Sequence, residues 1–220
     1  MNWENSKAGT PLKRDILKAW FESEQRFFLT GGSALGLFYL DHRLSYDLDL
    51  FSSEPVDGKE IQNLILRIAE SIDAHAETLR TTPDFHRFVL TRDSDKEIID
   101  VVIDRAPQLE SEKMSIGTIQ VDTIREIVAN KLSALLGRAE LKDLIDLYYL
   151  EKSGRDLISA IPDAMEKDGG WEPATVSMIL ESMDTTLTPD LLIFDLDQKD
   201  FEAFVDQFRV AVAELIFPKS

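Results

Sequence analysis

The amino-acid sequence predicts a mixed α/β (α+β) fold, in which an α/β lobe is followed by a helical C-terminal lobe. Segments typical of strands mix with segments of helical spacing in the first half of the chain, whereas only helix-like segments follow residue 123. The 220 residues, 44% of them hydrophobic, are enough to bury at least one full core. We therefore expect two domains, residues 1–120 and residues 121–220.

In the first half, the spacing of apolar residues distinguishes helices from strands. Ile16, Leu17, Trp20 and Phe21 recur at helical spacing, whereas a short apolar run follows that is typical of a buried strand. A diglycine ends this strand, and the serine after it is placed to cap a helix. The expected elements, in order, are a helix at 14–24, a strand at 27–29, a helix from Ser33 to Tyr39, a strand at 46–51, a helix at 58–72, and strands at 76–80, 85–91 and 97–104.

The second half has apolar residues at helical spacing throughout. Glycines separate successive segments, for example Gly137, Gly154 and the pair Gly169-Gly170. The expected helices span 123–136, 140–151, 157–166, 173–183 and 199–216.

Composition limits the classes of partner and location. With 41 acidic and 24 basic residues the net charge is -17, so a nucleic acid would have to find a local basic patch. The absence of cysteine excludes disulfides and thiolate metal sites and fits a reducing compartment. No stretch reaches the roughly 18 apolar residues of a membrane span, and the N-terminus lacks the apolar core of a signal peptide. We expect a soluble, cytoplasmic protein without a membrane segment.

Two aspartates interrupt the apolar strand expected at 46–51. Because side chains alternate along a strand, Asp47 and Asp49 lie on one face while Leu48 and Leu50 lie on the other. Carboxylates this close repel one another unless a cation lies between them, and magnesium prefers such oxygen ligands. The alternative interpretation is a half-exposed strand with two solvated acids.

A glycine turn precedes this strand. Gly31, Gly32 and Ser33 lie between an expected strand and an expected helix, where glycines allow a ligand close to the backbone and helix amides attract an anion. Many ordinary strand-to-helix turns have the same composition, so this signal is weak by itself.

A third carboxylate lies on the strand expected at 97–104. Its alternation places Asp100 and Asp104 on one face and apolar residues on the other. If this strand lies beside the one with Asp47 and Asp49, three carboxylates converge, with either Asp100 or Asp104 as the third. Carboxylates holding metal ions beside a phosphate-binding turn suit phosphoryl or nucleotidyl transfer.

A second cluster of charged residues lies at the start of the helical half. Lys131 falls within or at the edge of an apolar helical stripe, which suggests either a cation facing nucleotide phosphate or a lysine whose ammonium reaches water. Asp143 and Asp146, three residues apart, share a helix face. They are placed to hold Lys131 or Arg138, or to be solvated.

Taken together, these segments resemble the nucleotidyltransferase superfamily of the DNA polymerase beta type, and within it the AbiEii/AbiGii-type toxin family. The resemblance rests on the glycine turn, the segment from Arg43 through Ser45 to Asp49, the acid at 100, and the charged block from Glu126 to Asp146. It covers about residues 27–150, and the residues beyond rest on helical periodicity alone.

The resemblance implies a minimal nucleotidyltransferase lobe, with a mixed sheet flanked by helices, and a helical lobe that closes a cleft. Asp47 and Asp49 would hold magnesium, and Asp100 would complete the metal site or deprotonate the acceptor. Lys131 would contact phosphate as a catalytic residue. Nucleotide contacts or their support are implied for Gly31, Gly32, Ser33, Arg43, Ser45, Asp143 and Asp146.

The implied function is magnesium-dependent transfer of a nucleoside monophosphate (NMP) from an NTP to a tRNA-like RNA or to another hydroxyl acceptor. The protein would be the toxin of a toxin-antitoxin or phage-defence system, with a separately encoded antitoxin as its partner. Two alternatives stay open. One is a non-catalytic protein-interaction module with the same fold, and the other is a nucleotidyltransferase for small molecules, as in antibiotic modification.

Overall fold

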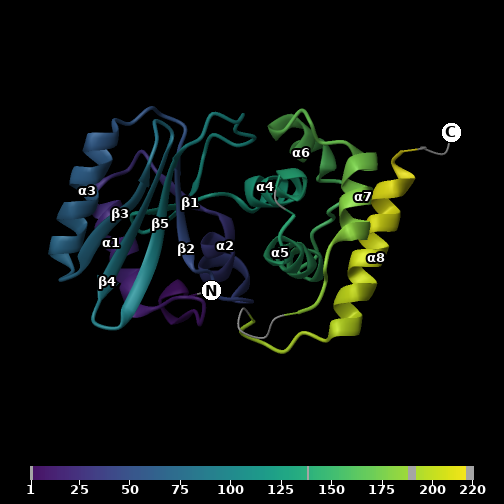
Figure 1. Ribbon diagram of the computed structural model, residues 1–220, viewed down its shortest axis with the longest axis horizontal. Helices are drawn as coiled ribbons and strands as arrows, with labels where there is room; N and C mark the ends of the chain where they lie inside the picture. The colour runs from purple at the N-terminus through teal and green to yellow at the C-terminus, as the bar shows by residue number, and fades with distance from the viewer. Residues whose placement is uncertain (1, 138, 188–191, 217–220) are drawn as a thin grey trace. The chain divides into compact units, whose positions relative to one another are not determined.

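The computed structural model describes residues 2–137, 139–187 and 192–216 of the chain. These residues form two compact units (Figure 1). The α/β unit contains the chain up to Arg105 together with Glu110–Thr123. The helical unit contains Ala106–Leu109 and the chain from Ile124 onward.

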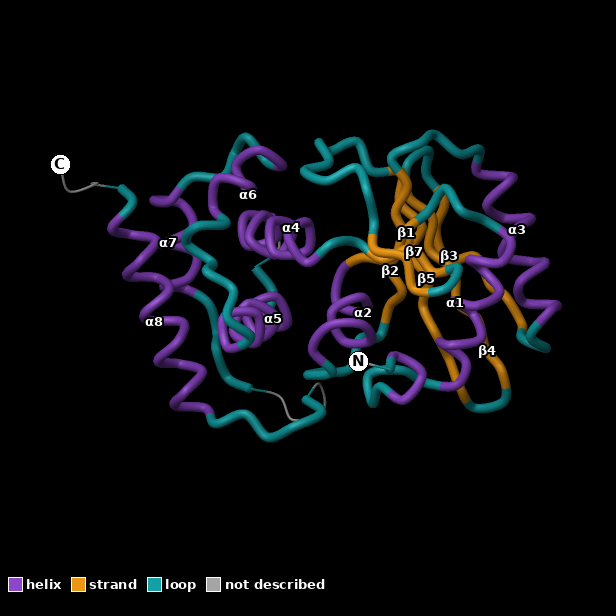
Figure 2. The backbone as a smooth tube through the Cα atoms, turned by 180° about the vertical axis from the view of Figure 1, so that it is seen from behind, coloured by secondary structure: helices purple, strands orange, loops and turns teal. Residues whose placement is uncertain are grey.

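A seven-stranded mixed sheet forms the centre of the α/β unit, with the strand order β3-β4-β5-β2-β1-β7-β6 (Figure 2). β2 pairs with β5, and β1 with β7, in parallel, and the remaining neighbours are antiparallel. The predicted fold class, a mixed sheet with helices followed by a helical segment, is confirmed. The strands are β1 (Phe28–Thr30), β2 (Asp47–Ser52), β3 (His75–Thr81), β4 (Phe85–Arg92), β5 (Asp95–Ile103), β6 (Met114–Ile116) and β7 (Ile119–Val121).

Helices α1 (Pro11–Ser23) and α3 (Gly58–Ser71) cover one face of the sheet, as Figures 1 and 2 show. The apolar stripe of α1 and the inward residues Leu48 and Leu50 of β2 are fully buried in this layer. The opposite face carries α2 (Gly31–Ala34), which continues as the π-helical segment η2 (Leu35–Leu40) and packs on β1 and β2. A short 3-10 helix, η1 (Trp3–Asn5), precedes α1. β1 and β2 therefore have one face in the core and the other toward α2.

Two details of the α/β unit differ from the sequence-based prediction. Ser33 does not cap a helix, because α2 already begins at Gly31 with Thr30 as its N-terminal flanking residue, and the Ser33 hydroxyl donates to the carbonyl of Asp47 instead. The β6–β7 hairpin was not predicted, since its three-residue strands are too short for alternation to be recognised.

A buried ion pair fixes the N-terminal helix to the sheet. The Lys13 ammonium lies 3.3 Å from Oε2 of Glu97 and also donates to the backbone carbonyl of Ser45, while the Thr10 hydroxyl donates to Glu97 Oε1 at 2.6 Å. Burial raises the pKa of Glu97, and the charge of Lys13 opposes this shift. The pair thus connects α1 both to β5 and to the segment that leads into β2.

Five helices make up the helical unit within the described residues, and four of them begin within one residue of the predicted start. The third starts at Ile161 instead of 157, because residues 157–160 form turns. The core includes Tyr148 packed edge-on against Phe204, with ring centroids 5.4 Å apart, and Trp171, whose indole N–H donates to the Leu132 carbonyl at 3.0 Å. The helices are α4 (Ile124–Gly137), α5 (Leu141–Lys152), α6 (Ile161–Lys167), α7 (Pro173–Ser182) and α8 (Gln198–Glu214).

One buried histidine of the α/β unit is not satisfied by hydrogen bonds. The His86 side chain is 1% exposed, and neither ring nitrogen has a partner among the described residues. Burial lowers the pKa of His86, an effect that the nearby carboxylate of Asp57 only partly opposes. The folded chain therefore disfavours the protonated form of this imidazole.

We predict that His86→Leu makes the stability of the protein less sensitive to acid. The unfolded chain binds a proton on this histidine that the folded chain disfavours, so stability is full above about pH 6.5 and falls as the pH drops through the ordinary histidine range. Urea unfolding at about pH 7.5 and about pH 5.5 should show a smaller loss in the variant than in wild type, with a difference of at most about 1.4 kcal/mol per pH unit.

The matched control is His75→Leu, which removes an exposed histidine from β3. At the higher pH, His86→Leu should be as stable as wild type or more stable, because it removes two buried polar atoms that lack partners. An unchanged pH dependence in His86→Leu would mean that this imidazole does not titrate differently on folding.

Candidate active site

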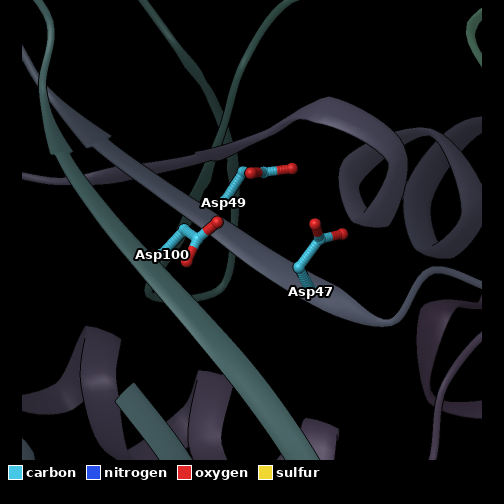
Figure 3. A group of neighbouring side chains, drawn as sticks. All are labelled: Asp47, Asp49 and Asp100. Carbon is cyan, nitrogen blue, oxygen red and sulfur yellow. The ribbon is translucent and has the colours of Figure 1, made fainter. Parts of the chain in front are cut away.

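Three carboxylates converge on the face of the sheet that carries α2. Asp47 and Asp49 lie on β2 and Asp100 on β5, and one oxygen of each lies within 4.8 Å of the others (Figure 3). The parallel pairing of the two strands places Asp49 directly beside Asp100. Asp104, the alternative third acid, lies beyond the end of β5 and is not in this group. The carboxylate triad is thus Asp47, Asp49 and Asp100.

The glycine turn is shaped around Asp49. Gly31 has a left-handed backbone, with φ of +66°, and a Cβ atom there would lie 2.2 Å from Oδ2 of Asp49. Any side chain at 31 would therefore both strain the backbone and displace the carboxylate. The serine before β2 orients Asp47, because the Ser45 hydroxyl donates to Oδ1 of Asp47 at 3.1 Å.

Arg43 lies directly against the second glycine of the turn. Its side chain is 2% exposed and donates to the carbonyl of Leu44 at 2.8 Å. A Cβ atom at Gly32 would lie 2.4 Å from Nη2 of Arg43 and 2.9 Å from the hydroxyl of Ser45. With Ser33 bonded to the Asp47 carbonyl, the predicted nucleotide-contact residues 31–33, 43 and 45 all surround the start of β2.

Sequence reasoning missed Arg87, which pairs with the third acid. Arg87 on β4 stands opposite Asp100, and its guanidinium donates twice, from Nε to Oδ1 at 2.7 Å and from Nη2 to Oδ2 at 2.6 Å. The hydrogen bond to Asp100 raises the pKa of Arg87, and the charges of Asp47 and Asp49 add to this. A signal was present: the β4–β5 hairpin turns at Asp93 and Ser94, and counting five residues from Arg92 and from Asp95 pairs residue 87 with residue 100.

The composition of the triad suits a hard divalent cation. All the candidate ligands are carboxylate oxygens, which magnesium prefers. Three carboxylates and one guanidinium give a formal local charge of about -2, so the site attracts a divalent cation electrostatically. The residues present therefore fit magnesium chemistry.

The second predicted cluster forms within the helical unit. The Lys131 ammonium on α4 lies 2.8 Å from Oδ1 of Asp143 and 2.7 Å from Oδ2 of Asp146, both on α5. Lys131 is 4% exposed and the two carboxylates are fully buried. The structure thus brings Lys131, Asp143 and Asp146 together, whereas Arg138 lies outside the described residues. A lysine at the edge of a helical stripe here has its charge enclosed by carboxylates rather than by water.

Among the residues that the structure describes, no helix has both the length and the apolar composition needed to cross a bilayer.

Two crystal structures share this fold. A candidate nucleotidyltransferase from H. pylori is 20% identical, with a TM-score of 0.61, and the match covers 95% of this chain and 95% of that one. JHP933 from Helicobacter pylori is also 20% identical, with a TM-score of 0.62, over 96% of this chain and 92% of that one. At this identity the likeness shows the fold alone. No curated protein matches the sequence.

The family is shown by a match over most of the chain. Residues 15–215 match the family described as nucleotidyl transferase AbiEii toxin, type IV TA system. This confirms the resemblance to the AbiEii toxins and extends it beyond residue 150. The chain belongs to the AbiEii family of nucleotidyltransferase toxins of type IV toxin-antitoxin systems, and it is an enzyme of the nucleotidyltransferase class.

Proposed function

We propose that this enzyme transfers a nucleoside monophosphate from an NTP to a hydroxyl acceptor, with magnesium held by Asp47, Asp49 and Asp100. The observation that carries the proposal is the convergence of these three carboxylates within 4.8 Å, on neighbouring parallel strands. The family supports an NTP as substrate and an antitoxin as the genetic partner.

In the proposed reaction the acceptor hydroxyl oxygen bonds to the α-phosphorus and loses its proton to solvent, the bond from that phosphorus to the β-phosphate oxygen breaks, and pyrophosphate leaves. Asp47, Asp49 and Asp100 would hold magnesium, which would supply positive charge near the reacting phosphate. The glycine turn leaves its backbone open to the phosphates, and the side chains of Arg43 and Ser45 lie close to that turn. Both oxygens of Asp100 already accept from Arg87, which favours Asp100 as a ligand over Asp100 as the proton acceptor.

Lys131 is the proposed phosphate contact of the helical unit. Asp143 and Asp146 hold its ammonium in a fixed position, and both acids are within hydrogen-bond distance. Such a buried charge cluster holds the ammonium in one orientation, which an electrostatic role in phosphoryl transfer requires.

We propose a hydroxyl at an RNA end, of tRNA type, as the acceptor, with a small hydroxylated molecule as the alternative. The net charge of -17 opposes a polyanion at long range, so an RNA would have to be held by local contacts. A non-catalytic interaction module is not favoured, because a scaffold has no need for three converging acids.

The first test is Asp47→Asn. We expect a Mg²⁺-dependent rise of the melting temperature with NTP in wild type, because ligand that binds only the folded state stabilises it, and no such rise in the variant. Transfer of labelled NMP, offered with RNA or with small hydroxylated acceptors, should fall by about 100-fold or more. The control is Asp104→Asn, an acid just past the same sheet that is not part of the triad. If Asp47→Asn keeps the Mg²⁺-dependent shift, the proposed metal site is wrong.

A second prediction concerns the glycine turn. Gly31→Ala should destabilise the chain by about 1–2 kcal/mol through its left-handed backbone, and it should also abolish the Mg²⁺-NTP shift by displacing Asp49. Gly117→Ala is a matched control, because φ is +62° there and nothing lies within 4 Å of the added Cβ. Equal effects of the two variants on nucleotide binding would show that the turn does not serve the triad.

A third prediction separates stability from activity at Lys131. Lys131→Met leaves two buried carboxylates without their cation and should cost about 3–5 kcal/mol in the free energy of unfolding. The triple variant Lys131→Met, Asp143→Leu, Asp146→Leu removes all three charges and should recover much of that stability. It should nevertheless stay inactive in NMP transfer. An active triple variant would mean that the cluster serves the helical core only.

A further inference from the structure

Arg87 lies in a row of charged residues that crosses the sheet beside the triad. The strand registers align Arg80 of β3, Arg87 of β4, Asp100 of β5 and Asp49 of β2 on one face. The side chain of Arg87 is 41% exposed, whereas that of Asp100 is 7% exposed. The guanidinium therefore lies at the open rim of the site, directly next to a proposed metal ligand.

The contact geometry lets Arg87 and a metal share Asp100. A carboxylate has about four lone-pair positions, and the two-point contact with Arg87 uses one on each oxygen. Each oxygen keeps a further position for a cation. The guanidinium is also steadied by an aromatic ring, since its Cζ lies 5.6 Å from the centroid of Phe85. Arg87 is thus fixed in place, while both oxygens of Asp100 can still bind a metal ion.

The charges indicate what such an arginine does to metal binding. Without Arg87 the triad carries about three negative charges within a few ångströms, and Arg87 compensates one of them. The two-point contact with Asp100 places the guanidinium charge directly beside the triad. The positive charge of Arg87 repels an arriving cation and so reduces the net attraction of the triad for a metal ion. The polyphosphate of a nucleotide would bring negative charge that offsets this repulsion.

We propose that Arg87 is a positioning residue that takes the place of a cation at Asp100 in the free enzyme and makes metal binding depend on the nucleotide. It holds Asp100 in the ligand orientation before metal arrives, and it weakens binding of the metal alone. This inference rests on the proposed metal site at Asp47, Asp49 and Asp100.

An ordinary structural ion pair would behave differently. Arg92 on the same strand pairs with Asp15 at 2.8 Å and donates to the Ile72 carbonyl, so it joins the hairpin to the helical layer rather than to the triad. Removing Arg92 should change stability and leave metal affinity as it is. Removing Arg87 should change metal affinity itself. The two arginines therefore form a matched pair for an experiment.

The test measures binding of Mn²⁺, as a spectroscopic substitute for Mg²⁺, to the full chain without nucleotide by electron paramagnetic resonance. Arg87→Gln should bind Mn²⁺ on the order of tenfold more tightly than wild type, because the opposing charge is gone. Arg92→Gln should bind it with wild-type affinity. In NMP transfer, Arg87→Gln should lower kcat with little change in the KM for NTP, since Asp100 is no longer held in orientation.

Arg87→Lys separates charge from geometry and keeps the test valid if Arg87→Gln does not fold. Lysine preserves the charge but not the two-point contact, so Mn²⁺ affinity should stay at the wild-type value while kcat falls. Unchanged or weaker Mn²⁺ binding by folded Arg87→Gln would overturn the proposal, and so would tighter binding by Arg87→Lys.

Failure of this inference can be told apart from failure of the proposed function. If wild type binds Mn²⁺, Asp47→Asn does not, and Arg87→Gln equals wild type, then only the role of Arg87 is wrong. If Asp47→Asn binds Mn²⁺ as wild type does, or if no variant binds it, then the metal site itself is wrong and the role of Arg87 falls with it.

Discussion

The parallel pairing of β2 with β5 is the constraint on which the rest of the site depends. It places Asp49 beside Asp100, and a shift of one residue would turn Asp100 into the core and bring an isoleucine into its place. Leu48, Leu50, Ile99 and Val101 hold this register, because all four are fully buried on the opposite face. The pairing of β2 with β5 therefore determines both which residues enter the hydrophobic core and how the triad is arranged.

Three polar contacts lock the start of β2 into that register. Lys13 holds the Ser45 carbonyl from the helical layer, and the Ser33 hydroxyl holds the Asp47 carbonyl from the other side. Ser45 in turn holds the Asp47 carboxylate. These contacts come from both faces of the sheet, so the segment before β2 cannot shift without breaking buried hydrogen bonds. Asp47 is thus held both at its backbone carbonyl, by Ser33, and at its carboxylate, by Ser45.

Much of this was predictable from local sequence patterns. Alternation along 46–51 and 97–104 correctly assigned Asp47, Asp49 and Asp100 to the polar faces of their strands, and helical spacing correctly marked Lys131 as unusual. Alternation does not indicate which strands become neighbours. Convergence of the three acids could therefore be predicted only on the condition that the two strands lie side by side. The choice of Asp100 over Asp104 likewise required knowing where β5 ends.

The features that sequence reasoning missed are long-range contacts. Arg87 lies on a strand whose alternation was recognised, yet its partner depends on the register of the hairpin rather than on its own segment. Ser33 has the right composition for a cap, but the glycine before it lets the helix begin earlier and leaves the hydroxyl to bind β2. Lys13 lies just before the helix predicted at 14–24, whereas in the structure it belongs to α1 and is buried against Glu97. In each case a distant strand decides the role of the side chain.

The fit between Gly31 and Asp49 also has an evolutionary consequence. The two positions occupy the same space, so a larger residue at 31 is compatible only with a smaller residue at 49. A lineage that keeps the activity would conserve both residues, whereas a descendant that lost the activity could change both together. Joint drift of these two positions among relatives would therefore mark inactive descendants, even where the remaining acids persist.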